Sequence, residues 1–329
     1  MTANNFPKML SPKIGLGCMN LSHAYGKPVA EEEAIKSLNA ALDMGYQHFD
    51  TATLYGAGKN ELLVGKALMH RRSEFFLASK CGMSMEDGKK LINGRPEHLK
   101  KQCEASLKRL GTDHIDLYYL HRKDPDVPIE ESTGALADLV KEGKIGAIGL
   151  SEVSAQTLRQ AHNEHPITAL QSEYSLWTRN PEIATLKACE DLNVTFVAFS
   201  PLARGFLSGA IKSQDDLIQG DIRNNMPRFD AQHYPKNLAL LGRFTDIASN
   251  IGCTPAQLAL SWVLHQSKNI VAIPGTRFVS HMEENLASHE HQLEQSTIAL
   301  LDELINQNTV SGPRYNQAQQ HEIDTEEFI

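Results

Sequence analysis

Short runs of apolar residues recur along the chain, and each is followed by a polar junction and then by a segment with helical periodicity. Apolar runs of this length are typical of strands that are buried on both faces of a parallel sheet. The pattern predicts eight such strands, which are Ile14–Gly17, Tyr46–Asp50, Phe75–Lys80, Ile115–His121, Ile145–Leu150, Thr168–Gln171, Val194–Ser200 and Ile270–Pro274.

The segments between these runs have the spacing and the end signals of helices. In Glu31–Met44 the apolar residues fall on one stripe, and Gly45 follows where a glycine commonly ends a helix. A second helix is predicted to begin at Pro96 and to stop at Gly111. Eight strands that alternate with helices predict an α/β fold, the (β/α)₈ TIM barrel, formed as a single domain over residues 1–329.

One connection is longer than a single helix requires, because about 70 residues separate the seventh and eighth strands. Its first part, residues 203–236, is rich in glycine and proline and has little periodicity, so we expect a long flexible loop over the C-terminal mouth of the barrel. Helices are predicted to follow at Asn237–Asn250 and Pro255–His265. The final segment, residues 311–329, is polar and acidic and is expected to be poorly ordered.

Composition narrows the classes of partner and compartment. The net charge of −8 and the absence of a Lys/Arg run argue against nucleic acid as the main partner. No apolar run approaches the ~20 residues that cross a bilayer, and Met1–Ser11 contains no apolar core of signal-peptide length. The five cysteines are scattered and form no C-x-x-C pair, which is typical of a reducing compartment. We therefore expect a cytoplasmic protein that acts on small molecules.

Polar residues end three neighbouring strands of the predicted barrel. Asp50 ends the second strand and Tyr55 follows it, Lys80 ends the third strand, and His121 ends the fourth. Since the C-terminal ends of barrel strands meet at one mouth, these four side chains are expected to form one cluster. Ionisable groups on buried strands are costly unless they are paired, which favours a functional site over four unrelated contacts.

The four groups make chemical sense together. A tyrosine titrates near pH ~10 and is a poor acid at neutral pH, but an adjacent ammonium group lowers its pKa. A carboxylate would hold the ammonium of Lys80, and a histidine would position a substrate carbonyl by hydrogen bonding. The cluster therefore predicts a proton donor for carbonyl reduction. No metal site is expected.

The order Asp50, Tyr55, Lys80, His121 resembles the catalytic tetrad of the aldo-keto reductase superfamily. The similarity runs from IGLGC in the first strand to IPGTR after the eighth. The segments GLSEVSAQTLRQAH, QSEYSLWTR and AFSPLARGFLSG are similar to the branch that contains perakine reductase and pyridoxal reductases. The resemblance implies reduction of aldehydes or ketones, with Tyr55 as the proton donor.

The resemblance also implies a nicotinamide cofactor and the residues that bind it. Ser151 and Gln171 would bind its carboxamide, Phe199 would stack on its ring, and residues after the eighth strand would bind its adenosine part. The implied cofactor contacts are Gly17, Cys18, Met19, Asp50, Ser151, Gln171, Phe199, Ser200, Pro201, Leu202, Arg204, Gly205, Gly275, Thr276, Arg277, His281, Glu284 and Asn285. Tyr25 and Trp177 are expected to line the substrate pocket.

Three positions depart from the pattern of the superfamily. Many members have asparagine where this chain has Glu152, so the resemblance does not imply a contact of this residue with the carboxamide. Better-known members have lysine at the position of Gly275 and arginine at that of His281. Arg277 can still make a bidentate contact with a 2′-phosphate, so NADPH is expected rather than NADH.

Two other function classes stay open at this point. A lysine at the end of a barrel strand can attack a carbonyl, so Lys80 is also compatible with a Schiff-base aldolase. The superfamily also includes ion-channel β subunits, so a cofactor-binding regulatory subunit is a second alternative.

Overall fold

The structure of the chain is a computed structural model that describes residues 6, 10–22 and 24–328. Most of Met1–Ser11, in which no signal peptide is expected, lies outside the described residues. Eight parallel strands form one sheet in the order β1-β2-β3-β6-β7-β8-β9-β10. Their bounds are β1 (Leu16–Gly17), β2 (His48–Asp50), β3 (Phe76–Cys81), β6 (Leu117–Leu120), β7 (Ile148–Ser151), β8 (Ile167–Glu173), β9 (Thr195–Phe199) and β10 (Ile270–Ile273).

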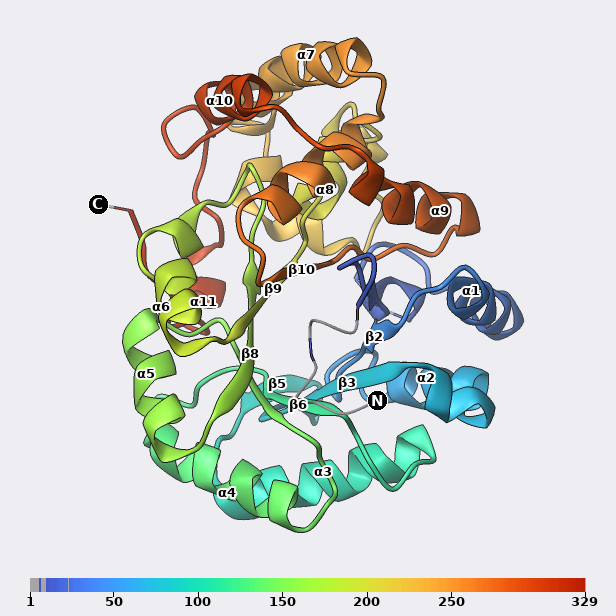
Figure 1. Ribbon diagram of the computed structural model, residues 1–329, viewed down its shortest axis with the longest axis vertical. Helices are drawn as coiled ribbons and strands as arrows, with labels where there is room; N and C mark the ends of the chain where they lie inside the picture. The colour runs from blue at the N-terminus through green and yellow to red at the C-terminus, as the bar shows by residue number, and fades with distance from the viewer. Residues whose placement is uncertain (1–5, 7–9, 23, 329) are drawn as a thin grey trace.

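The first and last strands join, and the sheet closes into a ring with helices outside it (Figure 1). The Gly15 N–H donates to the Ala272 carbonyl at 2.8 Å, and the Gly17 N–H donates to the Pro274 carbonyl at 3.2 Å. The predicted (β/α)₈ barrel is therefore confirmed, with all eight strands close to their expected positions.

The outer helices follow the end signals in the sequence. α3 begins at Pro96 and is followed by the capping residue Gly111, whose φ of 72° favours glycine. α8 begins with a capping box between Thr254 and Gln257. No helix of the described chain is both long and apolar enough to cross a membrane. The helices are α1 (Glu31–Asp43), α2 (Lys59–Leu68), α3 (Pro96–Leu110), α4 (Ile129–Lys141), α5 (Ala155–Glu164), α6 (Thr185–Leu192), α7 (Tyr234–Asn250), α8 (Pro255–His265), α9 (Val279–Ala287), α10 (Gln295–Leu304) and α11 (Gln317–Gln320).

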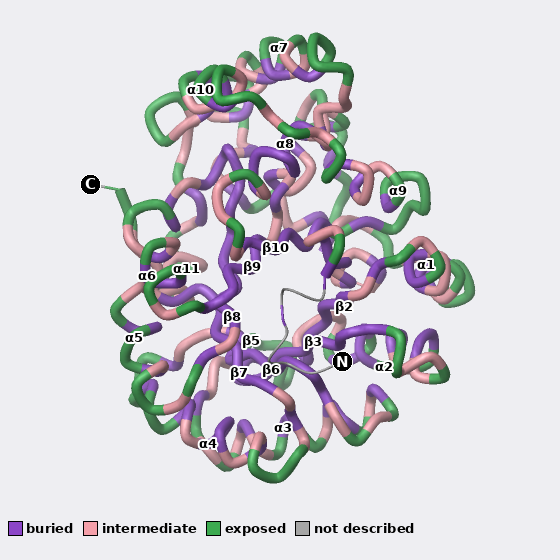
Figure 2. The backbone as a smooth tube through the Cα atoms, viewed as in Figure 1, coloured by how far each residue is buried: buried purple, intermediate pink, exposed green. Residues whose placement is uncertain are grey.

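Side-chain alternation along the strands determines what fills the barrel. Every residue of β3 is buried (Figure 2), and its side chains point alternately into the barrel and towards the helices. Phe76 and Ala78 belong to the apolar cluster that fills the barrel interior, so the next inward position is that of Lys80. The same alternation on β2 places Asp50 inward, beside Ala78 in the register. Asp50 and Lys80 thus lie at the mouth of the barrel, next to the apolar side chains that fill its interior.

His48 lies in this interior and has consequences for stability in acid. Neither ring nitrogen has a hydrogen-bond partner among the described residues, and the ring packs edge-on against Phe6 and Phe76. Burial lowers the pKa of His48 to about 4, below the value of about 6.5 in an unfolded chain. Between these two values the unfolded chain binds a proton that the folded chain does not, so acid favours unfolding.

We therefore expect the free energy of unfolding to fall by about 3 kcal/mol through this group as the pH drops from about 7 to about 4. Urea unfolding at a series of pH values measures the loss. His48→Gln removes this titrating group, so the slope of the free energy of unfolding against pH should decrease by the equivalent of nearly one proton. Equal pH slopes for the two proteins would contradict the assignment.

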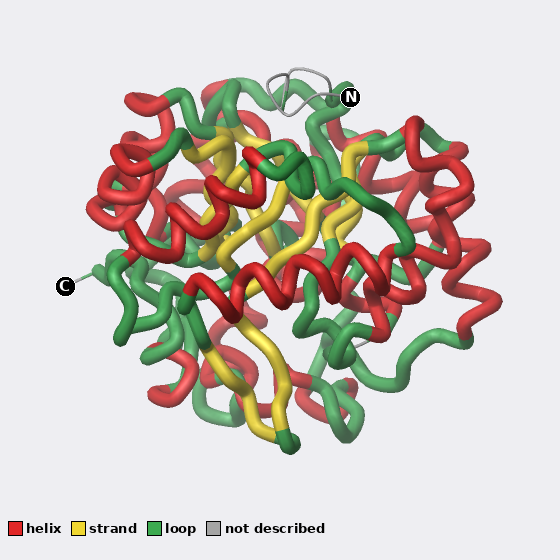
Figure 3. The backbone as a smooth tube through the Cα atoms, turned by 90° about the horizontal axis from the view of Figure 1, so that it is seen from below, coloured by secondary structure: helices red, strands yellow, loops and turns green. Residues whose placement is uncertain are grey.

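An antiparallel hairpin that the strand pattern did not include extends from the mouth of the barrel. It consists of β4 (Met83–Glu86) and β5 (Lys89–Ile92) and projects from one end of the barrel (Figure 3). Its turn is Asp87-Gly88, with φ values of 50° and 75°. A DG pair with positive φ is a strong hairpin signal, so the sequence did contain the information.

The long connection after β9 is built from short 3₁₀ helices. They are η5 (Ala203–Ser208), η6 (Gln214–Asp216), η7 (Ile222–Asn225) and η8 (Pro227–Phe229). The Ile222 N–H donates to the Ala24 carbonyl at 2.9 Å, so this connection meets the loop after β1. The expectation of a poorly ordered tail after Ser311 is wrong for residues 311–328, because Arg314 and Tyr315 are buried there.

Candidate active site

The structure brings Asp50, Tyr55, Lys80 and His121 together at the mouth of the barrel. Lys80 Nζ forms an ion pair with Asp50, donates to the Thr51 carbonyl at 2.9 Å, and lies 3.3 Å from the Tyr55 hydroxyl. The Tyr55 and His121 rings meet edge-on with their centroids 5.9 Å apart. A phenol, an ammonium group, a carboxylate and an imidazole thus share one site.

Tyr55 lies in the turn between β2 and α2, and a set of polar contacts supports this turn from outside the barrel. Arg109 of α3 donates to Glu61 at 2.7 Å and to the Thr53 hydroxyl at 3.1 Å. Gly58 has a φ of 86°, and a Cβ there would lie 2.8 Å from the Arg109 side chain. Sequence analysis did not find Arg109 or Glu61, because their contacts join segments far apart in the chain.

Burial and the Asp50–Lys80 pair determine the charges of the site. Burial alone would lower the pKa of Lys80, but Asp50 and Tyr55 outweigh it, and the pKa of Lys80 lies above its usual value. Burial raises the pKa of Tyr55 more than Lys80 lowers it, so the predicted net decrease is wrong. Burial, assisted by Arg122 and Lys80, holds the pKa of His121 well below its usual value. At neutral pH the site therefore contains a protonated phenol beside a neutral imidazole.

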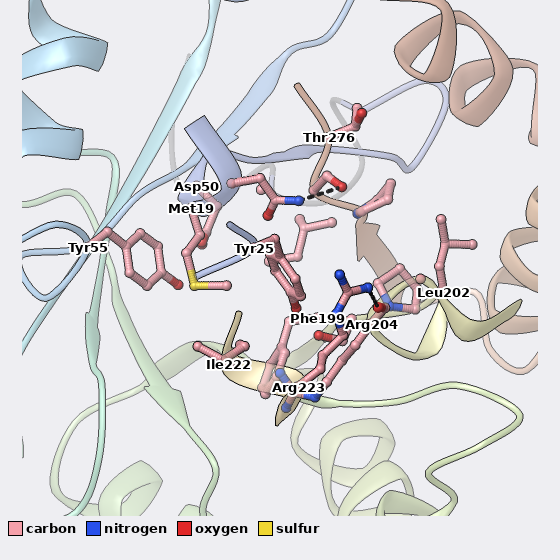
Figure 4. Close-up of a pocket in the computed structure, with 18 of the residues that line it drawn as sticks. Met19, Tyr25, Asp50, Tyr55, Phe199, Leu202, Arg204, Ile222, Arg223 and Thr276 are labelled. Carbon is pink, nitrogen blue, oxygen red and sulfur yellow. Dashed lines mark hydrogen bonds between the residues drawn. The ribbon is translucent and has the colours of Figure 1, made fainter. Parts of the chain in front are cut away.

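A cavity of about 620 Å³ extends from this cluster towards α9 (Figure 4). Tyr55 and His121 line it directly, whereas Lys80 is fully buried behind Tyr55 and Asp50. The expected cofactor and substrate residues that line the cavity are Gly17, Met19, Tyr25, Asp50, Ser151, Gln171, Phe199, Ser200, Pro201, Leu202, Arg204, Gly205, Gly275, Thr276, Arg277, His281, Glu284 and Asn285.

Two expected residues do not line the cavity. The Cys18 side chain is buried and directed to the Leu16 carbonyl, and its backbone N–H donates to the Asp50 carbonyl at 2.9 Å. Trp177 is stacked on Phe206 with ring centroids 4.3 Å apart and is only 4% exposed. The structure therefore corrects both expectations, since Cys18 positions β1 against β2 and Trp177 packs in the core.

The inner end of the cavity has the donors and surfaces that a nicotinamide amide requires. Gln171 donates from Nε2 to Asp50 at 2.8 Å, so its amide is fixed beside the tetrad. Ser151 is adjacent to Gln171 in the strand register. Phe199, at the end of β9, presents an aromatic side chain to the cavity. An amide, a hydroxyl and an aromatic ring around one space fit the carboxamide and the ring of a nicotinamide.

The outer end of the cavity is formed by the β10–α9 connection. Asn20 donates to the Gly275 carbonyl at 3.2 Å, and a Cβ at position 275 would lie only 2.6 Å from Asn20 Oδ1. A side chain at position 275 would therefore require Asn20 to move. Arg277 is exposed beside the cavity and donates to the Lys27 carbonyl at 3.3 Å. A cation at the end opposite the tetrad fits the phosphate of an adenosine.

Glu152 belongs to a buried ionic network that sequence analysis missed. Its backbone φ is 56°, a left-handed conformation that asparagine adopts more readily than glutamate. Arg314 of the C-terminal segment binds Glu152 at 2.6 Å and Glu173 at 3.1 Å, and Arg204 binds Glu173 at 2.6 Å. Burial would raise the pKa of Glu173, but the arginines, led by Arg204 and Arg314, hold it at about 2. Glu152 thus anchors the C-terminal segment and does not line the cavity.

Within residues 6, 10–22 and 24–328, no group of three or more His, Cys, Asp or Glu side chains is arranged to hold a metal ion. Fold and site together define a barrel with an acid–base cluster beside a cavity.

Comparison with known proteins identifies the family. A model of the Aldo/keto reductase family matches residues 13–306, and the chain belongs to this family. It is 43% identical over 311 residues to the aldo-keto reductase yakc [NADP(+)] of Schizosaccharomyces pombe, covering 92% of this chain and 91% of that protein. It is 41% identical over 311 residues to a probable aldo-keto reductase of Glycine max, covering 94% and 90%.

Solved structures agree with this assignment. A glycerol dehydrogenase of Gluconobacter oxydans superposes with a TM-score of 0.82 at 28% identity, covering 89% of this chain and 90% of that one. An aldo-keto reductase of Klebsiella pneumoniae in complex with NADPH superposes with a TM-score of 0.69 at 27% identity, covering 93% and 94%.

Proposed function

We propose that this enzyme is an NADPH-dependent reductase that converts aldehydes or ketones to alcohols, with Tyr55 as the proton donor. One observation carries the proposal: the Tyr55 hydroxyl borders the cavity and is held by Lys80, which is itself neutralised by buried Asp50. The NADP(+) in the name of the yeast relative and the NADPH bound to the Klebsiella enzyme support the choice of cofactor.

When bound, the cofactor supplies a hydride to the carbonyl carbon. The carbonyl oxygen accepts hydrogen bonds from the Tyr55 hydroxyl and from His121, which also lines the cavity. As charge develops on this oxygen, Tyr55 transfers its proton to it. Lys80 stabilises the phenolate that remains, and Asp50 keeps Lys80 charged and in place. Gln171, through its bond to Asp50, aligns the nicotinamide with this proton donor.

Arg277 is proposed to select NADPH over NADH by binding the 2′-phosphate. Arg277→Gln is expected to raise the Kd for NADPH by about 10- to 100-fold, because a charge-assisted hydrogen bond is lost. The Kd for NADH should change by less than about 3-fold, since NADH lacks this phosphate. Fluorescence titration of the wild-type and Arg277→Gln proteins with both nucleotides measures these values. Equal weakening of the two nucleotides would contradict the role of Arg277.

The site disfavours the Schiff-base alternative. A nucleophilic lysine must be neutral and must reach the substrate, but Lys80 is fully buried and its pKa is raised by Asp50 and Tyr55 against the effect of burial. The comparisons give no support to a regulatory subunit either.

The experiment that tests the function directly is turnover of a reactive aromatic aldehyde by the purified protein. Loss of NADPH absorbance that depends on both aldehyde and protein, with alcohol as the product, is the expected result. NADPH binding without turnover of any aldehyde would instead favour a cofactor-binding regulatory subunit.

The cysteines support the proposal that the enzyme acts in a reducing compartment. All five are free thiols, and four of them are buried. This state agrees with action in a reducing compartment such as the cytoplasm.

A further inference from the structure

Five cationic side chains line the cavity among the residues that the structure describes, and they differ in whether a carboxylate neutralises them. Three have such a partner, in the pairs Lys90–Glu322, Arg204–Glu173 and Arg223–Asp221. The other two, Arg122 and Arg277, form no ion pair with any carboxylate in the described part of the chain. Arg122 is partly buried, and partly buried charges are usually paired, so its charge suggests a ligand group that neutralises it.

The two unpaired arginines lie at opposite ends of the cavity. Arg277 is at the outer end, where the proposed function assigns it to the cofactor phosphate. Arg122 follows His121 directly in the chain, and its Nη1 donates to the His121 carbonyl at 2.6 Å and to the Ser151 hydroxyl at 3.2 Å. These bonds fix its guanidinium group beside the tetrad. The phosphates of a cofactor that spans the cavity would lie towards the other end, so they do not neutralise Arg122.

The remaining groups around Arg122 leave its charge available. Arg122 Nε is buried without a hydrogen-bond partner in the described part of the chain, and the side chain lines the cavity. The neighbouring His121 is neutral at pH 7, because burial, with the nearby cations, lowers its pKa. Lys80 cannot attract a second anion, since Asp50 already neutralises it. An anion bound beside the reacting carbonyl would therefore be held by Arg122.

We propose that Arg122 is a specificity-determining residue that binds a carboxylate of the substrate. The preferred substrates are then aldehydes or ketones that carry a carboxylate close to the reacting carbonyl. This inference rests on the proposed function. In the reaction the carbonyl carbon receives the hydride of NADPH, the carbonyl oxygen receives the proton of Tyr55, and the carboxylate is left unchanged. Because the guanidinium is fixed by two protein oxygens, little conformational entropy is lost on binding.

The test compares 2-, 3- and 4-carboxybenzaldehyde, each with its methyl ester, at saturating NADPH. The readout is the ratio of kcat/KM for the acid to kcat/KM for its ester, which cancels changes common to both. For at least one isomer, wild-type enzyme should favour the acid by about tenfold or more. Arg122→Gln should lower this ratio by about tenfold, and Arg122→Lys should retain part of it, since the charge remains but the planar fork is lost.

Arg277→Gln is the matched control, because it removes the same charge from the other end of the cavity. At saturating NADPH it should keep the wild-type ratio. If wild-type enzyme reduces acids and esters equally well, or if the Arg122→Gln and Arg122→Lys variants both keep the wild-type ratio, the inference is overturned and the proposed function stands. If wild-type enzyme reduces none of the aldehydes, the proposed function itself fails, and this inference with it.

Discussion

Replacing Tyr55 with phenylalanine is expected to lower kcat for aldehyde reduction by about a thousandfold, within the range of about 10²–10⁴ that general acid catalysis contributes. The phenyl ring keeps its packing against His121, but the site loses the hydroxyl that lies 3.3 Å from Lys80 Nζ. No other acid on the described chain lies in this position. Steady-state turnover of a neutral aromatic aldehyde measures the loss.

Cofactor binding provides the control for this variant. The Kd of Tyr55→Phe for NADPH should stay within about 3-fold of wild type, because the proposed cofactor contacts come from other residues. A Phe variant that turns over aldehyde at the wild-type rate would remove Tyr55 from the mechanism. A large loss of NADPH affinity would instead assign Tyr55 to cofactor binding.

Replacing Arg314 with methionine is expected to lower the free energy of unfolding by about 3–5 kcal/mol. The change leaves Glu152 without its ionic partner, and Glu152 is fully buried. Glu173 retains its ion pair with Arg204, so most of the loss in stability comes from the unpaired charge of Glu152. Urea unfolding of the wild-type and variant proteins measures the difference.

Two further variants distinguish the loss of the buried ion pairs from the loss of a positive charge in general. Lys141→Met removes an exposed cation that faces Asp138 at 3.4 Å and should change stability by less than about 0.5 kcal/mol. Adding Glu152→Gln to Arg314→Met should restore part of the loss, because the uncompensated buried charge is then absent. A loss below about 1 kcal/mol for Arg314→Met alone would show that the ion pairs do not stabilise the fold.

The sequence was sufficient to predict the barrel and the composition of the tetrad. Buried parallel strands leave near-continuous apolar runs, and the residue that ends each run must lie at the mouth, as Asp50 and Lys80 do. The hairpin β4–β5 was missed although its Asp87-Gly88 turn was visible. Its strands carry charged and exposed residues, because it projects beyond the barrel, and therefore lack the apolar pattern of the other strands.

The features that could not be predicted depend on contacts between distant segments. The Arg314–Glu152 pair joins residues 162 positions apart in sequence, and Arg314 belongs to a segment whose polarity suggested disorder. Trp177 resembles a pocket residue in sequence, and only the packing of Phe206 shows that it is covered. The direction of the Tyr55 pKa shift could not be predicted from the sequence either. Burial raises this pKa against the effect of Lys80, and the contribution of burial depends on how completely the folded chain encloses the ring.

The central claim is that the chain transfers a hydride from NADPH to a carbonyl carbon while Tyr55 supplies the proton. The most direct measurement uses NADPH that is deuterated at the transferred position of C4, with a neutral aromatic aldehyde, and determines the label in the alcohol by mass spectrometry. The account predicts alcohol that carries deuterium on the former carbonyl carbon, formed by wild-type enzyme and nearly absent with Tyr55→Phe. Alcohol without the label, or no alcohol from either protein, would contradict it.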